Sequence, residues 1–274
     1  MDIKYKNITI LSSTVLTKLN TEGKIWFEFK ELYQMFPKLS KKSISQQLSM
    51  MVESGLLMRI REGIYYIIPY EQDSETFMPD WHLLAEPLAR TEYYIGYYSA
   101  LQIHQLITQP SLKEQIVVNK QIKPNGTTIK SVKFQFIYHN EKHFFGYKKT
   151  WIDSFNRVLC SDLEKTIIDC LYKPDYAGGI VEIAKAIFMA KEKIKFDVLL
   201  KYALQFDSQV VIKRLGYLLE LLNIKTQIIE TLHNFRSASI SVLDTEAPKG
   251  GKILSRWNIQ QNIDIETIKT AILT

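Results

Sequence analysis

Apolar residues in the first part of the chain recur with the spacing of an amphipathic helix. The i, i+3, i+4, i+7 pattern of a helix with one apolar face is followed by Phe29, Leu32, Tyr33 and Phe36. Pro37 interrupts the pattern, because proline lacks the amide hydrogen that a continuing helix requires. The pattern therefore predicts a helix that packs one face into a core and ends at a short turn.

A second helix is predicted directly after this turn. Ser40 is placed to cap it and Gly55 to end it. Its apolar stripe, with the spacing i, i+4, i+7, i+8, consists of Ile44, Leu48, Met51 and Val52. The opposite face is polar and consists of Lys42, Ser45, Gln46 and Ser49. Such a helix buries one face and leaves the other for solvent or for a ligand.

A β-hairpin and a linker follow the second helix. Two apolar runs, 56–60 and 64–68, are separated by a short polar segment that contains a glycine, which is a hairpin signal. Helix, turn, helix and hairpin in this order predict a winged helix-turn-helix DNA-binding domain over residues 1–70. Residues 71–78 begin with the polar sequence EQDSET and are predicted to be a linker.

The remaining residues, 79–274, are predicted to form a larger domain. Helices are expected at 80–90 and 97–107, separated by a tyrosine-rich segment that we interpret as core packing in preference to a stacking platform for bases. Alternating residues predict strands between 115 and 148, and helical periodicity dominates from Asp162 onward. The predicted fold class is α+β: a winged helix-turn-helix, then a mixed α/β domain with a small antiparallel sheet and a C-terminal helical part.

Composition and charge agree with two globular domains. The 274 residues are 46% hydrophobic and carry a formal net charge of +6, which provides enough apolar side chains for two cores. Ten basic and six acidic residues fall in 1–70, so most of the positive excess lies in the predicted DNA-binding domain. Two cysteines are too few for a disulfide scaffold. We see neither a signal peptide nor a membrane-spanning apolar run, so a cytoplasmic protein is expected.

Cations at the start of the second helix indicate a function beyond folding. Lys41 and Lys42 lie in its first turn, where a positive charge opposes the helix dipole at a cost on the order of 0.3–1 kcal/mol. Contact with DNA phosphates would explain them, and glutamine can pair with adenine in the major groove. The predicted DNA-binding residues are Lys38, Lys41, Lys42, Ser43, Ser45, Gln46, Gln47, Arg59 and Arg61. The alternatives are a solvated helix face and a winged helix that binds a protein.

The densest acidic cluster beside a helix consists of Asp162, Glu164 and Asp169. Such carboxylates could hold Mg²⁺ for nucleotidyl transfer or phosphodiester cleavage. The same residues also suit helix formation, with Asp162 as the N-cap and Asp169 as the i+4 partner of Lys165. We favour the structural interpretation and predict no catalytic residue, no metal ligand and no cofactor.

Several segments of the larger domain form a characteristic set. In chain order they read YYIGYYSALQIHQL, FFGYKKTWI, CSDLEKTIIDCLYKPDYAGGIVEIAKAI, KRLGYLLELL and GGKILSRWNIQQN. With the hairpin sequence REGIYYIIP, this set resembles the antitoxins of AbiE-type abortive-infection systems, which are type IV toxin–antitoxin systems. The resemblance covers nearly the whole chain and is most specific at 161–183. By position, its antitoxin signature falls on Asp162, Glu164, Lys165, Asp169, Pro174, Gly178, Gly179, Arg214, Gly216 and Trp257.

The resemblance implies two roles and no catalysis. In this family the N-terminal winged helix binds operator DNA and represses the antitoxin–toxin operon. The C-terminal domain counteracts a cognate nucleotidyltransferase-like toxin, for which a stable complex is not required. Because one winged helix buries limited surface, specific binding predicts two copies, a homodimer on an inverted repeat. The expected partners are therefore double-stranded operator DNA and the toxin, with no membrane.

Overall fold

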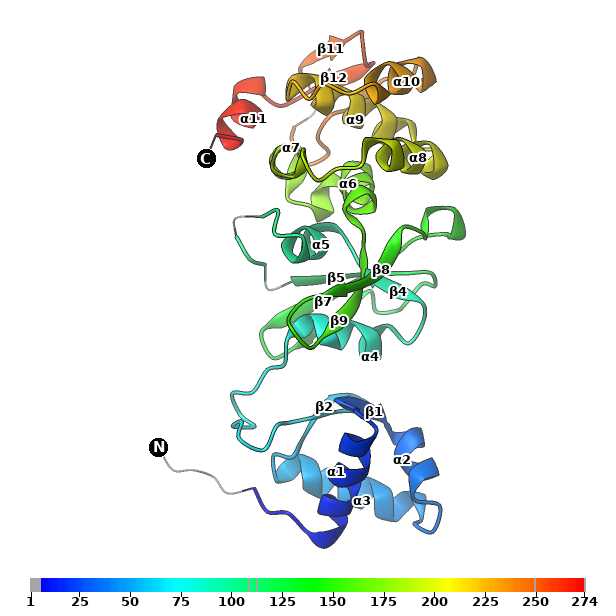
Figure 1. Ribbon diagram of the computed structural model, residues 1–274, viewed down its shortest axis with the longest axis vertical. Helices are drawn as coiled ribbons and strands as arrows, with labels where there is room; N and C mark the ends of the chain where they lie inside the picture. Colours follow the sequence, from blue (N-terminus) through cyan, green and yellow to red (C-terminus); the bar gives the residue numbers. More distant parts are fainter. Residues whose placement is uncertain (1–5, 108, 112, 249, 274) are drawn as a thin grey trace. The chain divides into compact units, whose positions relative to one another are not determined.

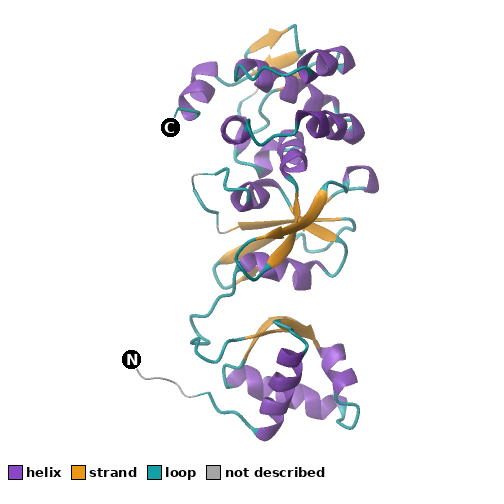
Figure 2. Ribbon diagram, in the orientation of Figure 1, coloured by secondary structure: helices purple, strands orange, loops and turns teal. Residues whose placement is uncertain are grey.

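The computed structural model describes residues 6–107, 109–111, 113–248 and 250–273. Its contacts divide the chain into two compact units, Met1–Arg90 and Thr91–Thr274. Figure 1 shows the helices and strands of both units, labelled where there is room, and Figure 2 distinguishes helices from strands by colour. Each unit has its own cluster of buried hydrophobic side chains.

The first unit consists of short helices and one small sheet. Its elements, in chain order, are α1 (Ile10–Thr21), β1 (Trp26–Glu28), α2 (Phe29–Met35), α3 (Lys41–Glu53), β2 (Leu57–Arg61), β3 (Ile64–Ile67), the 3₁₀ turn η1 (Trp81–Leu84) and α4 (Ala85–Ala89). The sheet is antiparallel, with the strand order β1-β3-β2. The predicted succession of helix, turn, helix and hairpin is therefore present from α2 to β3.

The apolar stripe of α3 lies in the core of the first unit. Ile44, Leu48 and Met51 are buried. They belong to one cluster with Leu19 of α1 and Leu32 of α2. Because one face of α3 is held in this core, Lys42, Ser45, Gln46 and Ser49 are directed to the opposite face.

The first unit extends further along the chain than the sequence predicts. The sequence places a linker at 71–78 and the start of the second domain at residue 79, whereas residues up to Arg90 belong to the first unit. One contact that holds this segment is a hydrogen bond from the Arg61 guanidinium Nη1 to the Leu88 carbonyl oxygen, at 2.9 Å. A polar composition marks a loop, but it does not show where a compact unit ends.

The second unit combines strands and helices. Up to residue 161 its elements are β4 (Tyr93–Ile95), α5 (Tyr97–Ile103), β5 (Lys113–Val118), β6 (Gly126–Ile129), β7 (Val132–Tyr138), the 3₁₀ turn η2 (Glu141–His143), β8 (Tyr147–Trp151) and β9 (Arg157–Ser161). The remaining elements are α6 (Leu163–Tyr172), η3 (Pro174–Tyr176), α7 (Gly179–Ala190), α8 (Phe196–Phe206), α9 (Gln209–Leu221), α10 (Ile228–Phe235), β10 (Ser241–Val242), β11 (Lys252–Leu254), β12 (Ile259–Gln261) and α11 (Ile265–Ala271). The mixed α/β class is as predicted.

The main sheet of the second unit has six strands in the order β6-β7-β5-β4-β9-β8. Within it, β5 pairs in parallel with β7, and β4 with β9, whereas the other neighbours are antiparallel. The sheet is thus larger than the small antiparallel sheet that the sequence predicts, and it is mixed in strand direction. A second, three-stranded sheet has the order β10-β12-β11. Alternation within one strand does not specify which distant strand becomes its neighbour.

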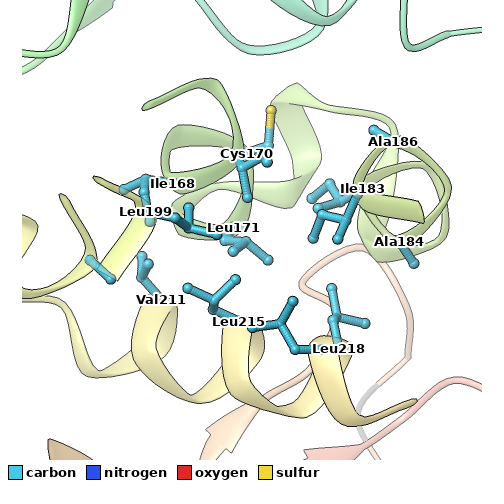
Figure 3. Close-up of a cluster of buried hydrophobic side chains, with 14 of the residues drawn as sticks. Ile168, Cys170, Leu171, Ile183, Ala184, Ala186, Leu199, Val211, Leu215 and Leu218 are labelled. Atoms are coloured by element: carbon cyan, nitrogen blue, oxygen red, sulfur yellow. The ribbon is translucent and has the colours of Figure 1, made fainter. Parts of the chain in front are cut away.

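The helices after β9 share one hydrophobic core. In Figure 3, Leu171 of α6, Leu199 of α8 and Leu215 of α9 lie in the same cluster of buried side chains. Cys160 and Cys170 are buried free thiols, and burial raises the pKa of both. Among the helices of the described residues, none is both long enough and apolar enough to cross a membrane.

Candidate nucleic-acid interface

The start of α3 presents a cationic surface. The Ser40 side chain caps the helix by accepting a hydrogen bond from the Ser43 amide at 3.1 Å, as the sequence predicts. The first turn of α3, which is fully described, contains no acidic residue, and Lys41 and Lys42 are both exposed there. The Lys41 ammonium lies 5.4 Å from the centre of the Tyr33 ring. The helix dipole and two ammonium groups therefore make this end of α3 strongly positive.

Most of the predicted DNA-binding side chains are exposed. On α3 the exposed face includes Ser45 and Gln46, and it extends to Ser49 and Met50. Met50 is not among the predicted residues, because an apolar side chain on a polar face gives no charge signal. On the hairpin, Arg59 of β2 is exposed. The exposed members of the predicted set are Lys38, Lys41, Lys42, Ser43, Ser45, Gln46 and Arg59.

Gln47 does not belong to this surface. Its side chain is 5% exposed, and its amide Nε2 donates a hydrogen bond to the Ser12 hydroxyl at 2.8 Å. Its assignment as a base-contacting residue is therefore wrong. The spacing contains the signal for this, because Gln47 lies three residues after Ile44 and four before Met51, on the side of the buried stripe.

Gln47→Ala is expected to destabilise the first unit while DNA affinity stays nearly unchanged. The substitution removes the donor of a buried hydrogen bond, at a cost of about 1–3 kcal/mol. Chemical denaturation and a parallel DNA titration would measure the two effects. Gln46→Ala is the matched control, since this exposed neighbour should change stability by no more than about 0.5 kcal/mol and should weaken DNA binding. An equal loss of stability in both variants would contradict the buried position of Gln47.

Arg61, like Gln47, makes a hydrogen bond within the first unit. Its guanidinium donates to the Leu88 carbonyl, and burial lowers its pKa. The strand register shifts between Arg59 and Arg61. The assignment of Arg61 as a DNA contact is therefore corrected: Arg61 fastens α4 to the hairpin, and Arg59 is the exposed cation of β2. The sequence gives no sign of this difference, because the acceptor lies 27 residues away.

The acidic residues of the predicted signature are engaged separately. Asp162 Oδ1 accepts a hydrogen bond from the Lys165 amide as the N-cap of α6, and its Oδ2 accepts one from the Tyr202 hydroxyl at 2.9 Å. Glu164 Oε1 accepts a hydrogen bond from the Lys195 amide at 2.8 Å. In the part of the chain that the structure describes, no group of three or more carboxylate, histidine or cysteine side chains is placed to hold a metal ion.

Lys165 and Asp169 form an ion pair inside the second unit. Both side chains are 0% exposed, and the Lys165 ammonium donates to Asp169 Oδ1. The Tyr94 hydroxyl accepts from Lys165 Nζ at 3.0 Å and donates to Asp169 Oδ2 at 3.0 Å. The ammonium also lies 5.0 Å from the Phe145 ring centre and 5.2 Å from that of Phe206. The sequence predicts this i, i+4 pair but not its complete burial.

His139 extends this buried network. Its Nε2 lies 2.8 Å from the Tyr97 hydroxyl and its Nδ1 3.1 Å from the Tyr94 hydroxyl. Burial lowers the pKa of His139 to about 2, so the ring is neutral and carries one N–H. Because the Tyr94 hydroxyl donates to Asp169, Nδ1 carries the hydrogen and Nε2 accepts from Tyr97. Sequence reasoning missed the network, since its members come from β4, α5, α6 and the residue after β7.

Further signature residues shape the backbone next to α6 and α7. Gly178 and Gly179, at the start of α7, have φ angles of 78° and 85°, a left-handed conformation that glycine adopts without strain. Arg214 donates from Nη1 to the Leu171 carbonyl at 2.7 Å and from Nη2 to the Val242 carbonyl at 2.9 Å. Burial lowers the pKa of this guanidinium to about 10. These contacts tie the C-terminal end of α6 to α9 and β10.

The last signature residues are packing residues. A Cβ atom at Gly216 would lie 2.0 Å from Cη2 of Trp257, so only glycine leaves room for the indole. Trp257 is 1% exposed, and its Nε1 donates to Glu220 at 2.7 Å. Pro174 begins the turn η3. The ten signature residues thus all cap, pack or pair inside the second unit, and the exposed cationic surface of α3 is the stronger candidate for a binding site.

The architecture has a counterpart among solved structures. No protein-family model matches the chain, and no curated protein matches it. A solved structure with 14% sequence identity shares the fold, with a TM-score of 0.70 over 98% of this chain and 97% of that chain. It is the crystal structure of the RV2827C protein from Mycobacterium tuberculosis. At this identity the likeness establishes the fold alone.

Proposed function

We propose that the chain is a DNA-binding transcriptional autorepressor and the antitoxin of an AbiE-type system. In this proposal the first unit is a winged helix-turn-helix with α3 as its recognition helix. The observation that carries it is the exposed, cationic and otherwise polar face of α3, beginning at Lys41 and Lys42. Two lysines at a helix start are unfavourable for folding, and phosphate binding accounts for them.

The face of α3 suits the major groove of DNA. The groove is about 12 Å wide and admits one helix. Gln46 can form two hydrogen bonds with adenine, and Ser45 can donate to or accept from any base edge. In this proposal Lys38, Lys41 and Lys42 contact phosphates, which fix the position of the helix without reading sequence. Since α3 has no arginine for guanine, we infer that A·T-rich sequence and DNA shape supply much of the specificity.

In this proposal the hairpin β2–β3 is the wing of the winged helix. Arg59 is exposed on β2, where its guanidinium can reach the adjacent backbone or the minor groove. Arg61 instead positions the hairpin against α4. One unit of this size buries limited DNA surface, so two copies on an inverted repeat are expected.

The antitoxin role is supported by the resemblance of the signature segments. Its residues lie within the second unit, where Arg214 of α9 donates a hydrogen bond to α6 and Gly216 of α9 packs against Trp257. The proposed partner is a nucleotidyltransferase-like toxin, counteracted with or without a stable complex. No observation favours the alternative of a metal-dependent nucleotidyltransferase, because Asp162, Glu164 and Asp169 each have a separate partner within the protein.

Lys41→Ala combined with Lys42→Ala is expected to weaken binding to the DNA upstream of the chain's own gene by about tenfold or more at physiological salt. Each lost phosphate contact should also reduce the slope of log K against log salt by about 0.9. Fluorescence anisotropy titrations between about 50 and 200 mM salt would measure affinity and slope together. Circular dichroism should show an unchanged fold, since both side chains are exposed.

Lys30→Ala is the control, because Lys30 is an exposed lysine of the same unit on α2. Its DNA affinity should stay nearly unchanged. If the parent protein binds no DNA, or binds it without dependence on salt, the α3 surface docks a protein or faces only water. If the double variant binds as tightly as the parent, α3 is not the recognition helix.

A further inference from the structure

The β8–β9 hairpin exposes two large aromatic side chains. It forms one end of the six-stranded sheet, because β8 is the last strand in the strand order. Trp151 at the end of β8 is 53% exposed, and Phe155 in the connecting turn is 90% exposed. Two such rings on one short hairpin are not explained by the core of this unit. The DNA-binding function proposed above makes no use of them.

Basic side chains surround these rings. Arg157 is paired with Trp151 across the two strands, and its guanidinium carbon lies 3.7 Å from the centre of the indole. Lys149 lies two residues before Trp151 and therefore on the same face of β8, while Lys148 lies on the other face. Both lysines are exposed, and in the described part of the chain no ion pair neutralises either ammonium.

The turn of the hairpin, which contains Phe155, is held by Asp153. The Asp153 carboxylate accepts hydrogen bonds from the amides of Phe155 at 2.6 Å and Asn156 at 2.7 Å, and from Asn156 Nδ2 at 2.8 Å. These hydrogen bonds, that of the Asn156 side chain first, lower the pKa of Asp153. The Asp153 carboxylate is therefore held by hydrogen bonds within the turn. The two lysines and the arginine leave the hairpin with an excess of positive charge.

We propose that the β8–β9 hairpin binds RNA through unpaired bases. Trp151 and Phe155 each stack on a base, since every base has a π face, while Lys149, on the same face as Trp151, contacts a phosphate. The guanidinium plane of Arg157 enlarges this platform, because arginine also stacks on bases. The positive charge matches a polyanion better than an apolar protein surface. Unpaired bases occur chiefly in RNA loops and ends, whereas cellular DNA presents its bases in a duplex.

The test is fluorescence anisotropy of the full chain with a labelled single-stranded RNA of about twelve nucleotides, a length within the site sizes of single-strand-binding proteins. Trp151→Ala with Phe155→Ala is expected to weaken RNA binding by about tenfold or more. Lys149→Glu, which changes only an exposed side chain, should weaken it most strongly at low salt. Phe235→Ala, at an aromatic that is 55% exposed on α10 of the same unit, should leave RNA affinity unchanged.

The hairpin and α3 surfaces can be separated in the same assay. Hairpin variants should keep the affinity of the parent for duplex operator DNA, and Lys41→Ala with Lys42→Ala should keep its affinity for RNA. The proposal is overturned if the parent does not bind the RNA at micromolar concentration, which would leave the hairpin to a protein partner. It is also overturned if the hairpin variants bind RNA like the parent, or if duplex RNA, whose bases are paired, binds equally well.

Discussion

Asp169→Ala is expected to destabilise the second unit by about 3–5 kcal/mol, the cost of leaving one member of a buried ion pair without its partner. The substitution leaves the Lys165 ammonium in the core without a counter-ion and removes the acceptor of the Tyr94 hydroxyl. Burial already lowers the pKa of Lys165, so Lys165 must either stay charged in an apolar core or give up its proton. Urea denaturation followed by circular dichroism would measure the loss, which is a large part of a typical domain stability of about 5–15 kcal/mol.

The double variant Lys165→Met, Asp169→Leu distinguishes the contribution of the ion pair to stability from that of side-chain packing. Replacing both charges with apolar side chains is expected to recover most of the loss, because such replacements are often neutral or stabilising. Glu266→Ala is the surface control, since it breaks the exposed pair with Lys269 and should change stability by no more than about 1 kcal/mol. If Asp169→Ala costs no more than Glu266→Ala, the Lys165–Asp169 pair is not buried in solution.

Gly216→Ala is expected to destabilise the second unit by about 1–3 kcal/mol, the cost of overpacking a core, although alanine is the better helix former. The new Cβ would lie 2.0 Å from Cη2 and 2.2 Å from Cζ3 of Trp257. The indole cannot retreat freely, because it is buried and hydrogen-bonded to Glu220. Thermal unfolding would show the loss, and the near-ultraviolet circular dichroism of tryptophan would report the displaced ring.

The second substitution Trp257→Phe tests whether this contact is direct. The smaller phenylalanine ring leaves room for the Cβ added at position 216. The stability lost in the double variant should therefore be smaller than the sum of the losses in Gly216→Ala and Trp257→Phe alone. Simple additivity would show that Gly216 and Trp257 act independently. The same cycle gives the coupling energy between α9 and Trp257, which lies two residues before the first residue of β12, Ile259.

Features that depend on neighbouring residues could be predicted from the sequence. The apolar spacing of α3 matches its buried stripe, and Ser40 and Asp162 cap their helices as predicted. The left-handed turn at Gly178 and Gly179 follows from the same kind of local signal. A cap or a stripe involves residues a few positions apart, so its signal lies within one short window.

Features that depend on distant residues could not be predicted. Tyr93–Ile95 forms a central strand, but three residues are too few to show alternation, and the sequence suggests only a tyrosine-rich segment between helices. The candidate site shows the same limit. Charge identifies the exposed Lys41 and Lys42, and helical spacing indicates the side on which Gln47 lies. The burial of Lys165, in contrast, depends on Tyr94, which only the fold brings near.

The burial of Cys160 and Cys170 makes the chain convenient for labelling. Alkylating reagents attack the thiolate, and both thiols are shielded in the core with raised pKa values, so the folded protein should not react with them. Cysteines introduced at the exposed positions Ser49 of the first unit and Asn140 of the second would then be the thiols that react with a maleimide dye. Distances between such dyes would follow the two units in solution without removal of the native sulfur atoms.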